Sequence, residues 1–449
     1  MRWARGWFLV AVVLTAVFSS LTPAVASNDP FFSDQWGLAQ VHAPEAWPSD
    51  SGAGITIGIV DTGVDSSHPD LAGRIGATTA CINTGGDPNK CGGSGGDIDG
   101  HGTHVTGIAV ADAGNGAGVA GVAPNARVVV ARVFQQATTS DGQPGMSATV
   151  GDVNAGIKWV VSQGARVVNL SLGLDPGRPP PSNFLIFGGQ NGQTLGAGIE
   201  WAWSNGAVPV LAADNDANGQ IDYPNAHAII VGATRRNGQM ASYSTSLSNS
   251  RWGMAAPGGE NSDPSEGIVS TWTQGRYAYL AGTSMAVPHV SAAVAMLLAQ
   301  GLTKDAAVQR LLNTADKIGC GSGCQGFLDV SSAIGVQLTP TPTTVVAGPA
   351  PTTAAGTRGR NSTARVPAKA GTAVVAAPPS TTSPVSPSTA ATLVDPTTTI
   401  PRPKGQQVTL SVQDDDGNGS HPVTAGIAVA LLAAVLGATA FAVRRRRGV

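Results

Sequence analysis

Short apolar runs alternate with amphipathic segments through the middle of the chain. Runs rich in valine and isoleucine end at turn residues, as at Ile55–Val60, Val128–Ala131 and Val167–Leu170. Between the last two runs, apolar residues recur every three or four positions from Val150 to Val160, which is the spacing of one helix face. Apolar strands that alternate with helices predict a mostly parallel sheet covered by helices on both faces. The expected fold is therefore a three-layer α/β domain.

The same alternation continues toward the C-terminus. The further strands and helices that it predicts are Ile199–Ser204 (helix), Val208–Leu211 (strand), His227–Ala233 (strand), Met285–Gln300 (helix) and Thr303–Thr314 (helix). Thr303 has the residue type and position of an N-cap for the last helix. All of these elements lie within residues 27–337, which we expect to form one folded domain.

Both ends of the chain carry patterns that direct proteins to membranes. Residues 1–26 combine Arg2 and Arg5 with an apolar run and a small-residue site, and predict a signal peptide cleaved after Ala26. An uncleaved anchor is the alternative, although the apolar run is short for a bilayer span. Residues 423–443 carry no charge and are followed by four arginines in the tail 444–449. They predict a transmembrane helix with a cytoplasmic tail, the alternative being a buried core helix.

Residues 338–422 are rich in Pro, Thr, Ser and Ala and contain few large apolar side chains. Such a segment cannot bury enough apolar surface to offset the entropy lost on folding. We therefore expect a disordered linker between the folded domain and the transmembrane helix. This layout predicts a single-pass protein of the cell membrane whose domain lies outside the cell.

Charge and cysteine content narrow the classes of partner and site. Charged residues are 12% of the chain and the net charge is -2, without the basic patch of a nucleic-acid-binding protein. The four cysteines lie in the part expected to be exported, where disulfides form. Local pairing predicts the bonds Cys81–Cys91 and Cys320–Cys324. A zinc site is the alternative, but no cluster of histidines and cysteines supplies four ligands.

Ser284 follows a glycine-threonine turn and lies at the expected start of the long helix Met285–Gln300. The free N–H groups and the positive end of the dipole at a helix N-terminus favour negative charge on a group that the serine attacks. Ser284 is thus a candidate nucleophile, although a serine at this position is more commonly an N-cap. Asp61, Ser171 and Asn215 each follow a predicted strand, so we expect them at one edge of the sheet, where α/β proteins bind ligands.

A serine nucleophile needs a base within hydrogen-bonding distance and a group that orients the base. His101 and His104 both lie at the start of an expected helix that runs to about Ala111. Asp61, at the end of the first strand, is the candidate orienting carboxylate. Spacing alone does not choose between the two histidines, which lie one helical turn apart.

Three segments resemble the signature blocks of the subtilisin-like serine proteases. They are Asp61-Thr62-Gly63-Val64, the block from His101 to Gly107, and Gly282-Thr283-Ser284-Met285-Ala286-Val287-Pro288-His289. The order Asp, His, Ser is that of the subtilisin triad. The likeness covers residues 28–333 and is closest to the thermitase-type branch. It implies a serine endopeptidase acting on protein or peptide substrates, with Asp61 as orienting carboxylate, His101 as base and Ser284 as nucleophile.

The same resemblance implies roles for residues around the triad. Asn215 matches the side chain that helps bind the oxyanion, but Asp214 stands where the family usually has glycine. Ser171, Leu172 and Gly173 resemble the edge strand that pairs with the substrate backbone and forms a wall of the S1 pocket. The connection 174–194 is longer than usual in the family. It is either a lid over the cleft or a surface insertion that packs on itself.

Calcium is the cofactor that the resemblance implies, in a structural role, with no cofactor needed for catalysis. The side-chain ligands would be Asp29, Asp70 and Asn115, because relatives hold the ion with oxygen atoms at these positions. The alternative for the two aspartates is an ordinary surface or capping carboxylate.

The whole layout is also similar to that of the mycosins, the subtilisin-like proteases of type VII secretion. The alternative function is therefore a mainly structural component of such a secretion complex, with other components of that complex as partners. Mycosins usually lack the second histidine of the block, which is His104 here. Only residues 27–60 separate the expected cleavage site from Asp61, so we also expect export without the separate folding prodomain that most relatives carry.

Overall fold

The computed structural model describes residues 27–138, 144–172, 194–221, 223–260 and 264–337, and the backbone of two short strands at 393–394 and 411–413. The expected signal peptide, transmembrane helix and cytoplasmic tail lie outside the described residues, as does nearly all of the expected linker. Within the described part of the chain, no helix has both the length and the apolar character needed to cross a bilayer.

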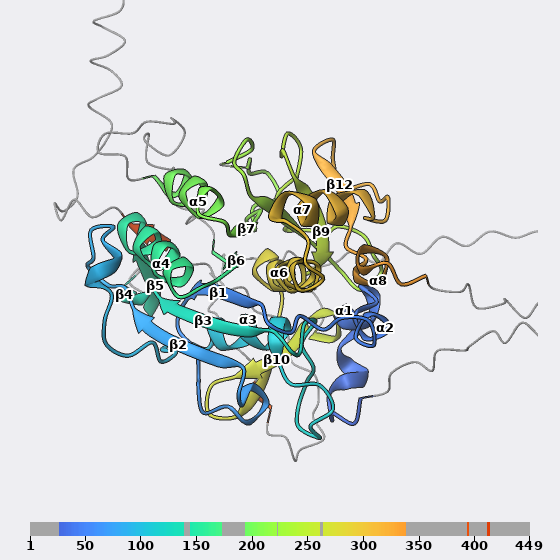
Figure 1. Ribbon diagram of the computed structural model, residues 1–449, viewed down its shortest axis with the longest axis horizontal. Helices are drawn as coiled ribbons and strands as arrows, with labels where there is room; N and C mark the ends of the chain where they lie inside the picture. Colours follow the sequence, from blue (N-terminus) through green and yellow to red (C-terminus); the bar gives the residue numbers. More distant parts are fainter. Residues whose placement is uncertain are drawn as a thin grey trace, which may run out of the picture.

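The centre of the domain is an eight-stranded sheet in which every neighbouring pair of strands is parallel (Figure 1). Its order is β12-β9-β8-β7-β6-β1-β3-β2. The strands are β1 (Thr56–Asp61), β2 (Ile75–Ala80), β3 (Arg127–Arg132), β6 (Val167–Leu170), β7 (Val208–Ala212), β8 (Ile229–Thr234), β9 (Gly253–Pro257) and β12 (Cys324–Phe327). The chain reverses its direction of travel across the sheet next to β1, a position where sheets of this kind bind ligands.

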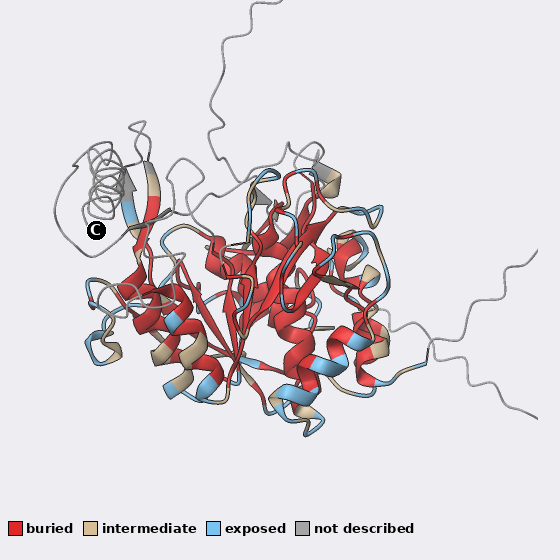
Figure 2. Cartoon of the chain, turned by 90° about the horizontal axis from the view of Figure 1, so that it is seen from above, coloured by how far each residue is buried: buried red, intermediate tan, exposed pale blue. Residues whose placement is uncertain are grey.

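Helices cover both faces of this sheet, as the alternation of elements predicts. Apolar side chains at alternating strand positions enter two separate cores, for example Ile59 with α3 and α6, and Val60 with α4 and α5. The helices are α1 (Trp36–Gln40), α2 (Ala43–Ala46), α3 (His101–Val110), α4 (Val150–Ser162), α5 (Leu195–Ser204), α6 (Thr283–Ala299), α7 (Lys304–Asn313) and α8 (Val330–Ile334). Figure 2 shows that the inner strands of the sheet are buried almost along their whole length, whereas the edge strands β2 and β12 are only partly buried.

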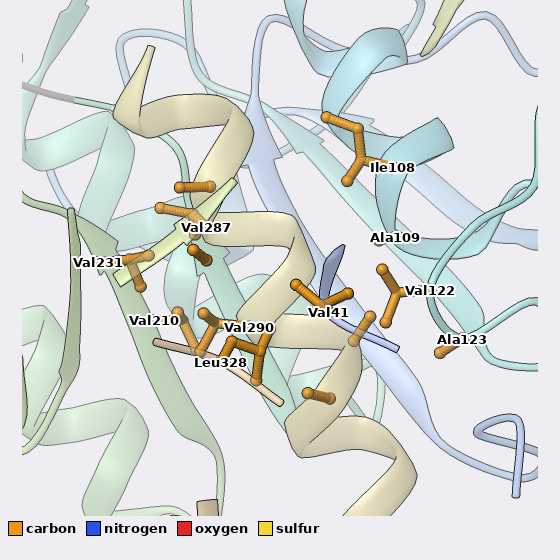
Figure 3. Close-up of a cluster of buried hydrophobic side chains, with 14 of the residues drawn as sticks. Val41, Ile108, Ala109, Val122, Ala123, Val210, Val231, Val287, Val290 and Leu328 are labelled. Atoms are coloured by element: carbon orange, nitrogen blue, oxygen red, sulfur yellow. The ribbon is translucent and has the colours of Figure 1, made fainter. Parts of the chain in front are cut away.

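Helix α6 runs through the larger core. Every residue from Thr283 to Leu298 is buried, and Val287 and Val290 lie beside Val210 and Val231 of the sheet (Figure 3). A fully buried helix has little freedom to shift, because its neighbours are packed at close to crystalline density. The N-terminus of α6, and with it Ser284, is therefore held firmly relative to the sheet.

Several elements lie outside the predicted pattern. An antiparallel hairpin of β10 (Ile268–Trp272) and β11 (Arg276–Leu280) packs against α3 and also pairs with β13 (Leu393–Val394). A second hairpin consists of β4 (Gln135–Thr138) and β5 (Pro144–Thr149), with β14 (Ser411–Gln413) beside β5. Four 3-10 turns complete the description: Phe32–Asp34, Pro69–Leu71, Pro88–Lys90 and Pro264–Glu266.

Both predicted disulfides are confirmed. Cys81 is bonded to Cys91, and Cys320 is bonded to Cys324. The first bond fixes the segment that leads from β2 toward α3. The second closes the turn before β12.

Candidate active site

Asp61 and His101 form a buried hydrogen-bonded pair at the carboxyl end of β1. Nδ1 of His101 lies 2.7 Å from Oδ1 of Asp61, and the side chains are 1% and 0% exposed. The same carboxylate oxygen accepts a hydrogen bond from the Thr62 N–H at 2.7 Å. Because Nδ1 faces the carboxylate, it carries the proton of the neutral ring, and Nε2 is left as the acceptor.

The approach of α3 to β1 sets this geometry. A Cβ atom on Gly102 would lie only 2.1 Å from the Gly63 carbonyl oxygen, so a larger residue would push the histidine away from Asp61. Asp97 holds the start of α3, since its carboxylate accepts hydrogen bonds from the N–H groups of Gly100 and Thr103, both at 2.8 Å. Sequence reasoning missed Asp97. The signal available was its place among the polar residues just before the helix, where capping carboxylates are common.

His104 has quite different surroundings. Its Nε2 atom lies 3.1 Å from the Ile268 carbonyl oxygen and 3.0 Å from that of Ala278, so the ring ties α3 to the hairpin β10–β11. Burial lowers the pKa of His104 to about 3, and the ring stays neutral. The structure therefore separates the two histidines that spacing leaves equivalent, and brings only His101 to Asp61.

The electrostatic environment of His101 favours its protonated form. Burial by itself lowers the pKa of His101, but the neighbouring carboxylates together raise it by more, and Asp61 contributes most through its charge and its hydrogen bond. The carboxylate of Asp99 adds to this rise, and the net pKa of His101 lies above the ordinary value of 6.5. An imidazole that is stabilised when it gains a proton is suited to act as a general base.

Ser284 is the second residue of α6 and is 7% exposed. The N-cap position is taken by Gly282, so Ser284 is not an N-cap. Its hydroxyl donates to the Ser171 carbonyl oxygen at 3.2 Å, while the Ser171 hydroxyl donates to the Ser284 carbonyl oxygen at 2.8 Å. These two bonds join the N-terminus of α6 to the carboxyl end of β6.

Ser284, His101 and Asn215 line one cavity, together with the segment Leu280–Gly282 and Met285. The Nε2 atom of His101 is buried and has no hydrogen-bond partner among the described residues. A serine and a histidine with an unpaired ring nitrogen thus line the same cavity. His101 and Ser284, separated by 183 positions in the sequence, are both among the residues that line this cavity.

Asn215 lies just beyond the end of β7, with its amide held in a defined orientation. Its Oδ1 accepts hydrogen bonds from the Thr283 N–H at 2.9 Å and from the Thr283 hydroxyl at 3.1 Å. Because the oxygen is used in this way, the Nδ2 group is left to donate into the cavity. A donor fixed beside a nucleophile is what stabilisation of an oxyanion requires.

The structure describes two of the three residues that are expected to form a wall of the S1 pocket. Ser171 and Leu172 are buried and lie just after the end of β6, beside the N-terminus of α6. Gly173 and nearly all of the 174–194 connection lie outside the described residues.

Comparison with known proteins identifies the family. The model of the subtilase family matches residues 52–356. The chain belongs to the subtilase family. It is 37% identical over 294 residues to thermitase of Thermoactinomyces vulgaris, covering 65% of this chain and 92% of the relative. It is 36% identical over 265 residues to subtilisin Savinase of Lederbergia lenta, covering 58% of this chain and 83% of the relative.

Solved structures agree with this assignment. A structure of proteases from Pseudoalteromonas arctica matches with a TM-score of 0.55 and 30% identity, over 69% of this chain and 98% of the other. The nisin leader peptidase NisP from Lactococcus lactis matches in fold, with a TM-score of 0.53 and 21% identity, over 68% of this chain and 94% of the other. As a subtilase with several serine protease relatives, the chain is a serine endopeptidase. These comparisons give no support to the mycosin-like structural role.

The three residues that the thermitase likeness suggests for calcium do come together in this subtilase. Asp29 accepts hydrogen bonds from the N–H groups of Gly114 at 2.8 Å and Gly116 at 3.1 Å. Asp70 accepts from the Val119 N–H at 2.8 Å and from Nδ2 of Asn115 at 2.9 Å. The loop from Asp112 to Val119 thus lies across both carboxylates.

The two carboxylates have the character of a cation site. Asp29 is 5% exposed and Asp70 is 0% exposed, and neither forms an ion pair with a described residue. Burial raises the pKa of Asp70 to about 7, and the charge of Asp29 adds to the rise. A cation between them would offset the cost of keeping two buried carboxylates ionised. Oxygen atoms are the ligands that calcium prefers. These two carboxylates therefore fit the ion.

Asn115 fits the ion less directly. Its Oδ1 accepts a hydrogen bond from the Ala117 N–H at 2.7 Å, and its Nδ2 faces Asp70, so the amide must turn over to offer its oxygen. In the described part of the chain, no three His, Cys, Asp or Glu side chains group closely enough to hold a metal ion. A calcium ion here would need amide and backbone carbonyl oxygens in addition to the two carboxylates.

Proposed function

We propose that this subtilase hydrolyses peptide bonds with Ser284 as nucleophile, His101 as general base and Asp61 as the carboxylate that orients the base. The observation that carries the proposal is the buried Asp61–His101 hydrogen bond beside the cavity that Ser284 also lines. It gives the imidazole a fixed tautomer and leaves one nitrogen free to take a proton.

Nε2 of His101 takes the hydroxyl proton of Ser284 while Oγ forms a bond to the carbonyl carbon of the substrate. The imidazolium is stabilised by Asp61, and the carbonyl oxygen becomes an oxyanion. The carbon–nitrogen bond then breaks as His101 returns its proton to the leaving amine. A water molecule repeats the same steps on the acyl-enzyme, which frees Ser284.

The oxyanion would be bound by Nδ2 of Asn215 and by the backbone N–H of Ser284. The Ser284 N–H is among the first amides of α6, which have no partner within the helix. Both donors are supported by the folded protein before a substrate arrives, because Thr283 fixes the amide of Asn215 and the core fixes α6. Donors fixed in advance need no reorganisation during the reaction.

Substrate binding would also prepare the nucleophile. We expect the substrate backbone to add as a strand along Ser171, Leu172 and Gly173. A substrate N–H that bonds to the Ser171 carbonyl would displace the Ser284 hydroxyl from it. The hydroxyl is then free to turn toward Nε2 of His101, which has no other partner among the described residues.

Two further parts of the proposal come from the sequence. Asp29, Asp70 and Asn115 would hold a structural calcium ion, which when bound neutralises two buried carboxylates and secures the N-terminal segment to the loop Asp112–Val119. The signal peptide, linker and transmembrane helix would place residues 27–337 outside the cell, attached to the membrane by residues 423–443.

Peptide hydrolysis by the purified full chain tests the proposed chemistry. Wild type should cleave a peptide library, and Ser284→Ala should lose at least about 10³-fold in kcat. The control is Ser162→Ala, which removes a hydroxyl from an exposed position on α4 and should leave kcat unchanged. Activity retained in Ser284→Ala would contradict the proposal.

A further inference from the structure

Asp214 holds an unusual backbone conformation immediately before Asn215. Its φ angle is 81°, a left-handed conformation that most side chains avoid and that glycine adopts readily. Aspartate is among the few other residues that tolerate it, because its short side chain can bond to the local backbone. Here Oδ1 of Asp214 accepts a hydrogen bond from the Asn215 N–H at 2.6 Å.

Thr245 fixes the same segment from the other side. Its N–H donates to the Asp214 carbonyl oxygen at 3.2 Å, and its hydroxyl donates to the Asp216 carbonyl oxygen at 2.7 Å. The Asp216 N–H in turn donates to the Thr245 hydroxyl oxygen at 3.2 Å. Thr245 is fully buried, so these bonds attach the segment to the core.

Asn215 is therefore restrained through both its main chain and its side chain. The Asp214 carboxylate holds the main-chain N–H, and Thr283 holds Oδ1 of the side chain. Only the Nδ2 group remains to donate into the cavity. A change in the turn at Asp214 would rotate the Asn215 backbone. The side-chain amide would then either lose its bond to Thr283 or no longer direct Nδ2 toward the cavity.

We propose that Asp214 is a positioning residue that sets the direction of the Asn215 amide by combining a left-handed turn with a hydrogen bond to the Asn215 N–H. This role rests on the proposed function of Asn215 as oxyanion donor. Asp214 does not touch the reacting atoms. It acts through Asn215, and its effect should appear in turnover more than in substrate binding.

The negative charge of an ionised Asp214 opposes the stabilisation of an oxyanion by Asn215. Burial raises the pKa of Asp214, as does the neighbouring Asp216 carboxylate, because both disfavour the ionised form. An ionised Asp214 lies one residue from a donor that must stabilise a developing negative charge. Asparagine at this position would keep the hydrogen-bond acceptor and the left-handed turn without that charge.

Four variants of the full chain test the proposal, with kcat and KM measured on one peptide substrate. Asp214→Ala loses the acceptor and disfavours the turn, and should lower kcat about 10- to 100-fold with KM within about twofold. Asp214→Asn should keep kcat within about threefold of wild type or above it. Asp214→Gly keeps the turn but loses the bond, and should fall between them. Asn249→Ala is the matched control, since Asn249 is exposed and also left-handed, with φ 70°.

A double-mutant cycle separates positioning from general destabilisation. In an Asn215→Ala background, Asp214→Ala should change kcat by less than about twofold, because the group that it positions is gone. An equal loss in both backgrounds overturns the proposal, as does an Asp214→Ala enzyme with the kcat of wild type. If Ser284→Ala remains active, or if the wild-type chain is inactive, the proposed function itself falls, and the positioning role falls with it.

Discussion

Nδ1 of His101 lies 2.7 Å from Oδ1 of Asp61, inside a region that solvent hardly reaches. This one hydrogen bond fixes the proton on Nδ1, leaves Nε2 without a partner among the described residues, and raises the pKa of the ring. The tautomer, the orientation and the basicity of His101 therefore depend on Asp61. That dependence can be measured.

Asp61→Asn should lower kcat by about 10⁴-fold, the scale seen when the carboxylate of a serine protease triad is replaced. It should also shift the pH profile. The neutral imidazole is the active form, so kcat/KM rises as pH passes upward through the pKa of His101. In wild type that midpoint should lie above 6.5, and in Asp61→Asn it should move to lower pH, because a major cause of the raised pKa is removed.

The measurement is kcat/KM from about pH 5 to pH 9. Asp99→Asn serves as the comparison, since Asp99 raises the pKa of His101 without bonding to the ring. It should shift the midpoint less and leave kcat near wild type. An acid limb that stays in place in Asp61→Asn would contradict the assigned base.

Asn215→Ala should lower kcat by about 10²- to 10³-fold with little change in KM, because the donor acts on charge that develops only in the transition state. Asn218→Ala, which changes an exposed asparagine in the same loop, should match wild type. Steady-state kinetics on a single peptide distinguish the two. A loss that appears mainly in KM would indicate ordinary substrate binding in place of oxyanion stabilisation.

Most of the central sheet could be predicted because its strands are apolar on both faces. Val167–Leu170 was predicted to the residue as β6, and the strands around Ile59 and Val130 were placed within a residue at each end. β2, β9 and β12 were missed. β2 is an edge strand in which Gly76 and Ala77 are exposed, so it lacks the apolar run of the inner strands. Gly253–Pro257 contains small residues and a proline with no β-branched side chain, and Cys324–Phe327 is a four-residue edge strand, so neither carries a strand pattern.

Strand ends predicted the location of the site, and the resemblance predicted roles within it. Local sequence does not show which residues will contact each other in the folded protein. His101 and His104 differ only in what faces them, a carboxylate from β1 or the carbonyls of the hairpin β10–β11. Thr245 and Thr283 support the site through bonds that no local pattern signals.

The stability of the calcium-free protein should fall as pH rises from about 4 to 7. Asp70 has an ordinary pKa of 3.8 when unfolded and a raised pKa of about 7 when folded. Between these values the folded state holds a proton that the unfolded state has lost, so rising pH favours unfolding. Calcium should remove this trend, and at about 100 times its Kd should add about 2.7 kcal/mol.

The measurement is the thermal unfolding temperature across that pH range, with chelator and with calcium. Asp70→Asn should be more stable than wild type with chelator at neutral pH, because a buried carboxylate is gone. With calcium the order should reverse. Asp112→Asn is the control, since Asp112 already pairs with Arg74 and should show no such reversal. Identical curves with and without calcium would contradict the site.

Removal of residues 423–449, which leaves β13 and β14 in place, should release the protein from the membrane. The full chain should sediment with membranes and dissolve only in detergent, because 21 uncharged residues are long enough to span the bilayer. The truncated chain, expressed with its N-terminal segment, should appear in the culture medium with the same kcat/KM. Fractionation followed by immunoblotting gives the answer. A full chain found in the soluble fraction would contradict its attachment to the membrane.

The most direct test of the central claim is covalent labelling of the full chain with a fluorophosphonate, followed by peptide mass spectrometry. A serine activated by His101 should carry one adduct, on the peptide that contains Ser284, and His101→Ala should abolish labelling while the protein stays folded. An adduct on another residue, or labelling of Ser284 that continues without His101, would contradict the account.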